Sequence, residues 1–291
     1  MSNPRVRLYV GAALISLSPV WVKLVEVSPT TSGFYRAAIG GVAMVIYLGV
    51  MRKSLKLPRW VFGMLVVASV FFALDLWFWH RSINYIGPGL STLLANFQVF
   101  IMMAVGIVVL KQPPRPAQLI AVPLALLGLA LIVGLDWGSL PDDYRLGVIF
   151  GLLTAVSYAG YLLSMRQLRT SATDSMPTRE IAIMSLLVAA FLGVSAIAEG
   201  DSLVIGTWTD VGWLLGYGLL SHTLGMMLIA SSLPKVSTTE AGLALLLQPT
   251  LSFVWDVVFF ARPMTPTELV GASIALVAIW LGSRPVRQTS R

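Results

Sequence analysis

Long apolar stretches separated by short polar breaks run through the whole chain. Each stretch is close to the roughly 20 residues that an α-helix needs to cross a bilayer. The stretches are continuous rather than alternating, and every backbone amide in lipid must be satisfied within its own segment, so helices are favoured over barrel strands. The pattern predicts an all-α polytopic membrane protein of about ten transmembrane helices. The stretches cover Leu8–Val25, Thr31–Met51, Trp60–Ile83, Gly89–Leu110, Ala117–Gly134, Leu146–Arg166, Arg179–Ala198, Trp208–Ser232, Val236–Phe260 and Pro266–Ser283.

Composition supports this class. Hydrophobic residues make up 57% of the chain and charged residues 11%, outside the range of water-soluble domains. The absence of cysteine excludes disulfides, thiol nucleophiles and cysteine-based metal sites. The first stretch follows Arg5 and Arg7 as in a signal peptide but lacks a small-residue cleavage site, so we expect a retained helix. We therefore predict that the lipid bilayer is the protein's partner. We predict no nucleic-acid partner, despite a net charge of +7.

The cationic residues are divided unevenly between the two sides of the predicted bundle. Because a cationic excess marks the cytoplasmic face, we predict an integral protein of the plasma (inner) membrane with both termini cytoplasmic. Termini on one side require an even number of spans, which ten satisfies. The Lys/Arg-rich side holds Arg5, Arg7, Arg52, Lys53, Lys56, Arg59, Lys111, Arg115, Arg166, Arg169, Arg179, Lys235, Arg284, Arg287 and Arg291. The opposite side holds Arg81, Arg145 and Arg262 with most of the acids.

An internal repeat recurs about 150 residues along the chain. The pairs that carry most weight are Gln98 with Gln248, Pro113 with Pro263 and Pro116 with Pro266. Each half then contains about five helices, and an odd number makes the second copy insert upside down relative to the first. We predict two inverted five-helix repeats, residues 1–137 and 138–291.

Three segments resemble a known family. They are SPTTSGFYRAAIGGVAMVIY (Ser28–Tyr47), SYAGYLLSMRQL (Ser157–Leu168) and ASSLPKVSTTEAGLALLLQPTLSFVW (Ala230–Trp255). In order and spacing they are similar to the second, sixth and eighth-to-ninth helices of the EamA-type family in the drug/metabolite transporter superfamily. Among its members, the YddG amino-acid exporters are similar in size and aromatic content. Departures are Val99, where a proline is common, and Gln112 and Arg262, where an acid is usual.

The resemblance implies a secondary or facilitative exporter of small metabolites, amino acids including aromatic ones, working by alternating access through a central cavity. The alternatives are a multidrug or organic-cation exporter of the same fold and an intramembrane enzyme. The enzyme is disfavoured because the sequence has no zinc-protease or nucleophile-elbow motif, so we predict no catalytic residue. It also has no phosphate-binding glycine motif. We expect no cofactor, no metal, a small-molecule substrate and a monomer as the functional unit.

The segment FFALDLWFWHRS, Phe71–Ser82, places charges within a membrane helix. Asp75 lies about two turns from the outer end, where an acid costs about 2.5–3.5 kcal/mol on insertion scales. We predict that Asp75, Phe78 and Trp79 form a wall of the substrate cavity. His80 is either a cavity residue or, like Arg81, a side chain that extends to the interface.

Small and polar residues recur at helical spacing in the ninth predicted helix, at Glu240, Gln248, Ser252 and Asp256. Ser91 and Gln98 lie on the corresponding face of the fourth predicted helix, which is the repeat equivalent of the ninth. Such a stripe either packs against another helix or lines an aqueous pathway, and we favour the pathway because it carries two acids.

Five further residues are candidates with an open alternative. Tyr158 and Tyr161 share a helix face and suit either a ligand or an interfacial belt. Lys23 and Arg36 suit either interface contact or a substrate carboxylate. His222, which shares a face with two glycines, suits either tight helix packing or a gating or proton-accepting site.

Overall fold

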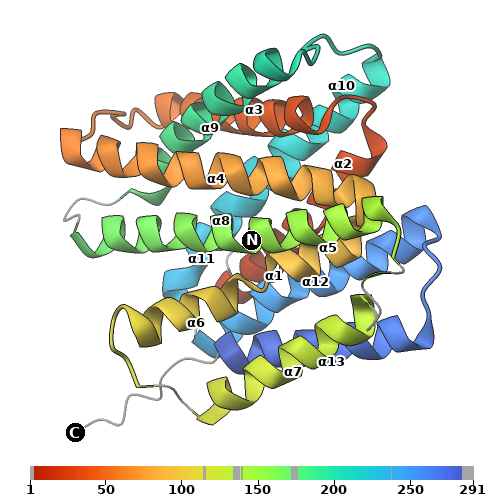
Figure 1. Cartoon of the computed structure of the whole chain (residues 1–291). Helices are drawn as coiled ribbons and strands as arrows, with labels where there is room; N and C mark the ends of the chain where they lie inside the picture. Colours follow the sequence, from red (N-terminus) through yellow and green to blue (C-terminus); the bar gives the residue numbers. More distant parts are fainter. Residues whose placement is uncertain are drawn as a thin grey trace, which may run out of the picture.

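The computed structural model describes residues 3–113, 116–133, 138, 140–171, 176–236 and 238–283, apart from the side chains of 133, 238–240, 242, 243, 245 and 283. The helices run side by side across the view in Figure 1, with α6 toward the left and α5 toward the right. They are α1 (Pro4–Ser16), α2 (Ser18–Leu24), α3 (Pro29–Val50), α4 (Arg59–Ile86), α5 (Pro88–Ala95), α6 (Gln98–Val108), α7 (Pro116–Val133), α8 (Asp142–Ser171), α9 (Pro177–Glu199), α10 (Trp208–Leu215), the π-helix η2 (Gly216–Gly225), α11 (Met226–Ser232), the short 3₁₀-helix η3 (Leu233–Lys235), α12 (Thr238–Phe260) and α13 (Pro266–Ser283).

The predicted all-α polytopic architecture is confirmed. In the described part of the chain, seven helical segments are long and apolar enough to cross a membrane, and shorter apolar helices lie in α7, α12 and α13. Each predicted stretch corresponds to one helix or to two or three helical segments in succession. Two spans are broken in the middle, between α1 and α2 and between α5 and α6.

The break between α5 and α6 occurs although the family's proline is replaced by Val99. The Asn96 side chain donates a hydrogen bond to the Thr92 carbonyl (2.8 Å), and the Val99 amide donates to the Asn96 carbonyl (3.2 Å) in a three-residue turn. An asparagine that bonds its own backbone competes with the helical ladder. The bend therefore does not depend on proline.

The eighth span contains a full π-helical segment, η2. Its backbone bonds join residues five apart, and the Thr223 hydroxyl donates to the Gly218 carbonyl at the same separation (2.9 Å). Residues five apart in η2 therefore lie one turn apart on one face. Segments of this kind are frequent at functional sites.

Contacts between the two halves of the chain come in matched pairs. Helix α4 packs on α8, and the corresponding η2 and α11 pack on α1. In the same way α1 packs on α12 as α8 packs on α5, and α3 packs on η2 as α9 packs on α4. The pairs α3 with α9, α5 with α12 and α7 with α13 join corresponding helices directly. This is the pattern expected of two repeats related by a pseudo-two-fold axis.

The ends of α6 and α12 share an unusual backbone detail. Lys111 and Ala261, which lie 150 positions apart, both adopt the left-handed conformation, with φ of 54° and 48°. The next amide, of Gln112 or Arg262, donates to the carbonyl six residues earlier, at 3.0 and 3.5 Å. The same local geometry at positions 150 residues apart is what a repeat predicts.

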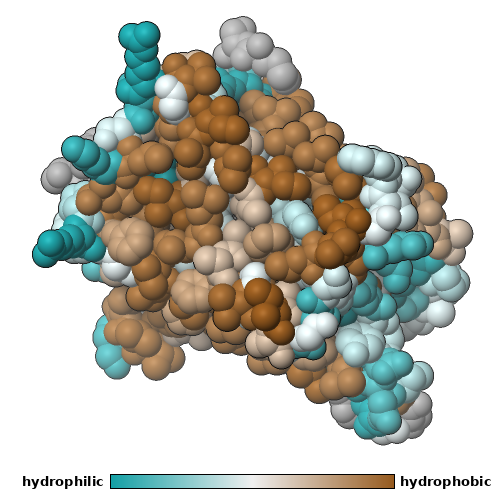
Figure 2. Space-filling view, turned by 90° about the horizontal axis from the view of Figure 1, so that it is seen from above, coloured by the Kyte–Doolittle hydropathy of each residue, from teal (hydrophilic) through white to brown (hydrophobic). Residues whose placement is uncertain are grey.

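The outer surface carries a broad apolar belt, brown in Figure 2, between hydrophilic ends in teal. Large apolar side chains such as Val50, Val194 and Ile197 are 68–71% exposed. Exposed apolar area on this scale is expected where lipid, not water, is the solvent.

Candidate functional site

A buried cluster of polar and aromatic side chains lies between α3, α4, α8, α9 and η2. Predicted site residues meet there from parts of the chain that are far apart in sequence. Those of the cluster are Arg36, Asp75, Trp79, His80, Tyr158, Tyr161 and His222; Tyr158 is half-buried and the others are buried.

Arg36 is at the centre of this cluster. Its Nε donates to Nδ1 of His222 (3.3 Å) and its NH1 to the hydroxyl of Tyr217 (2.9 Å). The guanidinium carbon lies 5.9, 5.7 and 5.0 Å from the ring centroids of Phe72, Trp79 and Tyr217. A guanidinium buried among three rings gains cation–π attraction while keeping some donors for a ligand.

The hydrogen bonds from Arg36 through Tyr217 and His80 to the Leu76 carbonyl all run in one direction. Nδ1 of His80 contacts the Leu76 carbonyl at 2.6 Å, and a carbonyl can only accept, so this nitrogen carries the proton. Nε2 of a neutral His80 then accepts from the Tyr217 hydroxyl (3.2 Å), whose oxygen accepts from Arg36. The protein thereby holds one tautomer of His80.

A second branch starts at the other side of Arg36. Because Nδ1 of His222 accepts from Arg36, its Nε2 is the donor to Ser185 Oγ (2.8 Å), and the Ser185 hydroxyl donates to the Ile181 carbonyl (2.7 Å). The hydrogen bonds fit two neutral imidazoles. The positive charge of the cluster then resides on Arg36.

Asp75 is the acid of the cluster. Its side chain is 7% exposed and is attracted electrostatically by Arg36. Among the described residues, no hydrogen bond or ion pair within 4 Å reaches its carboxylate. The rings of Tyr158 and Tyr161, stacked at 5.6 Å, lie near this group. A buried carboxylate without a bonded partner is costly, so no hydrogen bond among the described residues accounts for Asp75 as a structural group.

Phe78 and Lys23 lie elsewhere. Phe78 packs against Trp77 and Phe150, with ring centroids 5.1 and 6.0 Å away, in a separate aromatic group. Lys23 is exposed at the end of α2 and is near enough to Asp256 to attract it. Neither side chain contributes to the surroundings of Arg36 described above.

The stripe predicted along α12 makes close helix contacts. Ser252 Oγ donates to the carbonyls of Ser16 (3.2 Å) and Gln248 (2.9 Å), and Asp256 accepts from the Gly89 amide (3.0 Å). These bonds fit the packing alternative. A water-filled path along the stripe stays a prediction.

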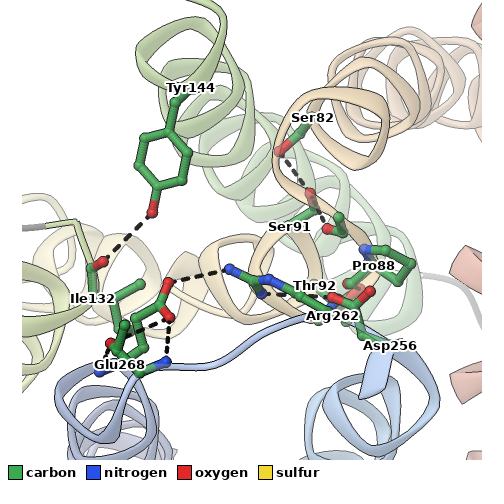
Figure 3. A network of polar contacts seen from close by, with 12 residues as sticks. Ser82, Pro88, Ser91, Thr92, Ile132, Tyr144, Asp256, Arg262 and Glu268 are labelled. Atoms are coloured by element: carbon green, nitrogen blue, oxygen red, sulfur yellow. Dashed lines mark hydrogen bonds and ion pairs between the residues drawn. The ribbon is translucent and has the colours of Figure 1, made fainter. Parts of the chain in front are cut away.

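The remaining members of the two polar faces are placed as follows. Ser91 accepts a hydrogen bond from Ser82 (2.9 Å), as Figure 3 shows. Its hydroxyl donates to the Gly87 carbonyl (2.8 Å). Gln98 lines a cavity at the start of α6. The Glu240 side chain lies outside the described residues. Among the residues that the structure describes, no three His, Asp or Glu side chains form a metal site.

Arg81 is held in place rather than extending freely to the interface. Its NH2 forms an ion pair with Glu199 (2.6 Å), and its guanidinium lies 3.6 Å from the Trp77 ring centroid. The Trp77 indole and the Thr30 hydroxyl donate to the same Glu199 carboxylate, at 2.6 and 2.8 Å. This group joins α3, α4 and α9 at the end opposite the Lys/Arg-rich side.

A sequence profile of the EamA-like transporter family matches residues 7–134 and 145–284. The chain belongs to this family. The two matched segments divide the chain close to the predicted boundary between the repeats. The family assignment expected from sequence is therefore confirmed.

Relatives of this EamA-like transporter cover nearly its whole length. YwfM of Bacillus subtilis, an uncharacterized transporter, is 25% identical over 263 residues, 90% of this chain and 86% of YwfM. The uncharacterized inner membrane transporter YhbE of Escherichia coli is 25% identical over 92% of this chain and 85% of its own. The pseudopaline exporter CntI of Pseudomonas aeruginosa is 26% identical over 84% and 82%. One solved crystal structure has a TM-score of 0.67 at 16% identity, over 97% of this chain and 98% of that one, which shows the shared fold.

The cluster contains three residues that sequence reasoning missed: Tyr217, Ser185 and Phe72. In an α-helix, Tyr217 and His222 point to different faces, because five residues exceed one turn by about 140°. The π-helix brings them together. Phe72 lies one helical turn before Asp75, which the sequence had already singled out, so helical spacing from Asp75 could have found it. No signal marked Ser185.

A glycine permits the close approach of η2 to α3. A Cβ atom added at Gly40 would overlap the His222 ring. Gly40 is thus needed for His222 to reach Arg36.

Replacing Gly40 by alanine is expected to destabilise the protein by about 1–3 kcal/mol, the typical cost of overpacking a filled interior. Thermal unfolding of the purified protein in detergent measures this. The matched control is Gly49→Ala on the same helix, where nothing lies within 4 Å of the added atom. Equal melting temperatures for the two variants would contradict the assigned contact.

Proposed function

We propose that this transporter exports small zwitterionic metabolites, amino acids including aromatic ones, by secondary or facilitative alternating access. The observation that carries the proposal is the presence of one buried cation, Arg36, and one buried acid, Asp75, in the same ring-lined cluster. No second cation of comparable burial belongs to the cluster as described, so phosphorylated substrates fit it less well.

The chemistry of an amino acid complements these groups. Its carboxylate suits the fork of guanidinium donors on Arg36, which accepts planar anions in a bidentate way. Its ammonium group suits the Asp75 carboxylate. Its side chain suits the rings of Trp79, Tyr158 and Tyr161, which provide apolar area and aromatic stacking.

An organic-cation exporter is the second candidate. Asp75 and the surrounding rings suit a quaternary ammonium group. Arg36, however, would repel it across a low-dielectric interior, where like charges interact strongly. The zwitterion is favoured because it uses both charges.

The architecture suits alternating access. We infer that residues 1–137 and 138–291 are inverted repeats with both termini in the cytoplasm. The matched helix contacts, the equivalent ends of α6 and α12 and the two family matches support this inference. We propose a monomer as the functional unit. The name of the exporter CntI supports the outward direction.

Competition between three related molecules tests the substrate class. Purified protein in liposomes is given radiolabelled phenylalanine, with unlabelled phenylalanine, phenethylamine or hydrocinnamate as competitor. The second lacks the carboxylate and the third lacks the amine, so each removes one proposed ion contact. We expect phenylalanine to compete at least about tenfold better than either analogue. Stronger competition by phenethylamine would instead favour the organic-cation exporter.

A further inference from the structure

Three charged side chains join α5, α12 and α13 at the end opposite the Lys/Arg-rich side. Asp256 Oδ2 accepts the Gly89 amide (3.0 Å) and lies 3.5 Å from NH1 of Arg262. Arg262 NH2 lies 3.4 Å from Glu268. Figure 3 shows Arg262 between the two acids. We call Asp256, Arg262 and Glu268 the latch.

The repeat gives each latch residue an equivalent in the first half of the chain. The equivalents, 150 positions earlier, are Gly106 for Asp256, Gln112 for Arg262 and Gln118 for Glu268. The two arginine-binding acids are thus replaced by a glycine and a glutamine, and the arginine by a glutamine. The polar contacts that join the helix ends in the second half therefore have no charged counterpart in the first.

These uncharged equivalents surround a hollow. A cavity of about 640 Å³ is lined by residues that include Gln98, Met102, Gly106, Gln112, Gln118 and Arg166. We call it the entrance cavity. It lies at the Lys/Arg-rich end, because α6, α8 and α13 all finish there. The latch lies at the other end of the same spans, where α5, α8 and α13 begin.

We propose that the entrance cavity is the subsite that receives substrate from the cytoplasm, with Arg166 attracting its carboxylate, while the latch keeps the opposite end shut. The pseudo-two-fold relation means that closing one end and opening the other exchanges the environments of equivalent positions. At the outer end Asp256 binds the Gly89 amide of α5 and is held by Arg262, which also pairs with Glu268, whereas glycine and glutamine at the inner end offer no such ion pairs. The resting molecule is therefore open toward the cytoplasm. The carboxylate assignment rests on the proposed function; the gate does not.

Two equivalent reporter positions test the gate. The chain has no cysteine, so Met102→Cys in the entrance cavity and Ser252→Cys, its equivalent 150 positions later, can each be labelled singly. Met102 is half-buried, whereas Ser252 is 0% exposed. With full-length protein in liposomes and a membrane-impermeant maleimide, we expect the first to react from the Lys/Arg-rich side and the second to be protected.

Breaking the latch should reverse this pattern. Arg262→Gln is expected to slow labelling of Met102→Cys and to speed labelling of Ser252→Cys, each by at least about threefold, because the outward-open population rises. Glu268→Gln breaks the same latch without touching the buried Asp256, and should act in the same direction. The control is Arg145→Gln, another arginine at that end, which pairs with Asp142 on its own helix. Latch variants that label like Arg145→Gln would overturn the gate.

A separate measurement tests the subsite. Arg166→Gln should raise the KM for phenylalanine by about tenfold and leave the labelling of Met102→Cys unchanged, since it removes attraction and not the gate. Arg59→Gln, an exposed arginine at the same end on α4, is the matched control. An unchanged KM in Arg166→Gln would overturn the subsite. Labelling is done without substrate, so a labelling shift without phenylalanine transport would support the gate and count against the amino-acid proposal.

Discussion

Replacing Arg36 by glutamine is expected to reduce phenylalanine transport by at least about a hundredfold. Arg36 donates to both His222 and Tyr217 and supplies the positive charge of the cluster. A hydrogen bond to a charged group contributes about 1.5–3 kcal/mol, and the variant loses such bonds to protein and to the substrate carboxylate together. Initial rates of flux in liposomes, normalised to inserted protein, measure the effect.

Arg36→Lys is the informative comparison. It keeps the charge but replaces the planar fork by a single ammonium group, so we expect an intermediate rate. Both variants should elute from size exclusion as the native protein does. Native-like transport by properly inserted Arg36→Gln would remove Arg36 from the substrate site.

Asp75→Asn is expected to lower phenylalanine transport by about tenfold to a hundredfold while leaving thermal stability unchanged or increased. The carboxylate has no hydrogen-bonded partner among the described residues, and its cost of burial outweighs its attraction to Arg36, so the neutral isostere removes a net cost and no structural bond. Transport falls because the variant lacks the attraction between the carboxylate and the substrate amine. Flux and thermal unfolding of the same preparation separate the two effects.

A second buried acid provides the matched control. Asp210 accepts the Glu26 amide (2.9 Å) and the Thr207 hydroxyl (2.7 Å) at the start of α10. Asp210→Asn should therefore lower the melting temperature and leave transport per folded molecule near native. If Asp75→Asn behaved as Asp210→Asn does, Asp75 would be a structural residue.

Much of the architecture could be predicted from the sequence because lipid imposes simple rules. A span needs about 20 apolar residues with internally bonded backbone, so the positions and helical nature of the spans follow from composition along the chain. The same rules singled out Asp75, since an acid in hydrocarbon is expensive. The family could also be recognised, because its segments keep their order and spacing.

Only the tertiary structure decided which side chains meet. Trp79 lies over Arg36 while its neighbour Phe78 packs on Phe150, because one helical step turns a side chain by about 100° and the sequence does not state which face is inward. Arg36 and His222 are 186 residues apart and meet through helix packing. Tyr217 joins them because η2 departs from the α-helical period.

The sequence by itself therefore determined that lipid surrounds the protein, and it determined the secondary structure and the family. All three depend on local composition and spacing. The three-dimensional packing decided that Arg36 and Asp75 share one cluster, and it decided the directed hydrogen bonds around Arg36 and the difference between the two ends of the molecule. Those depend on contacts between residues distant in the chain and on the rotation of each helix about its axis, which a local pattern does not record.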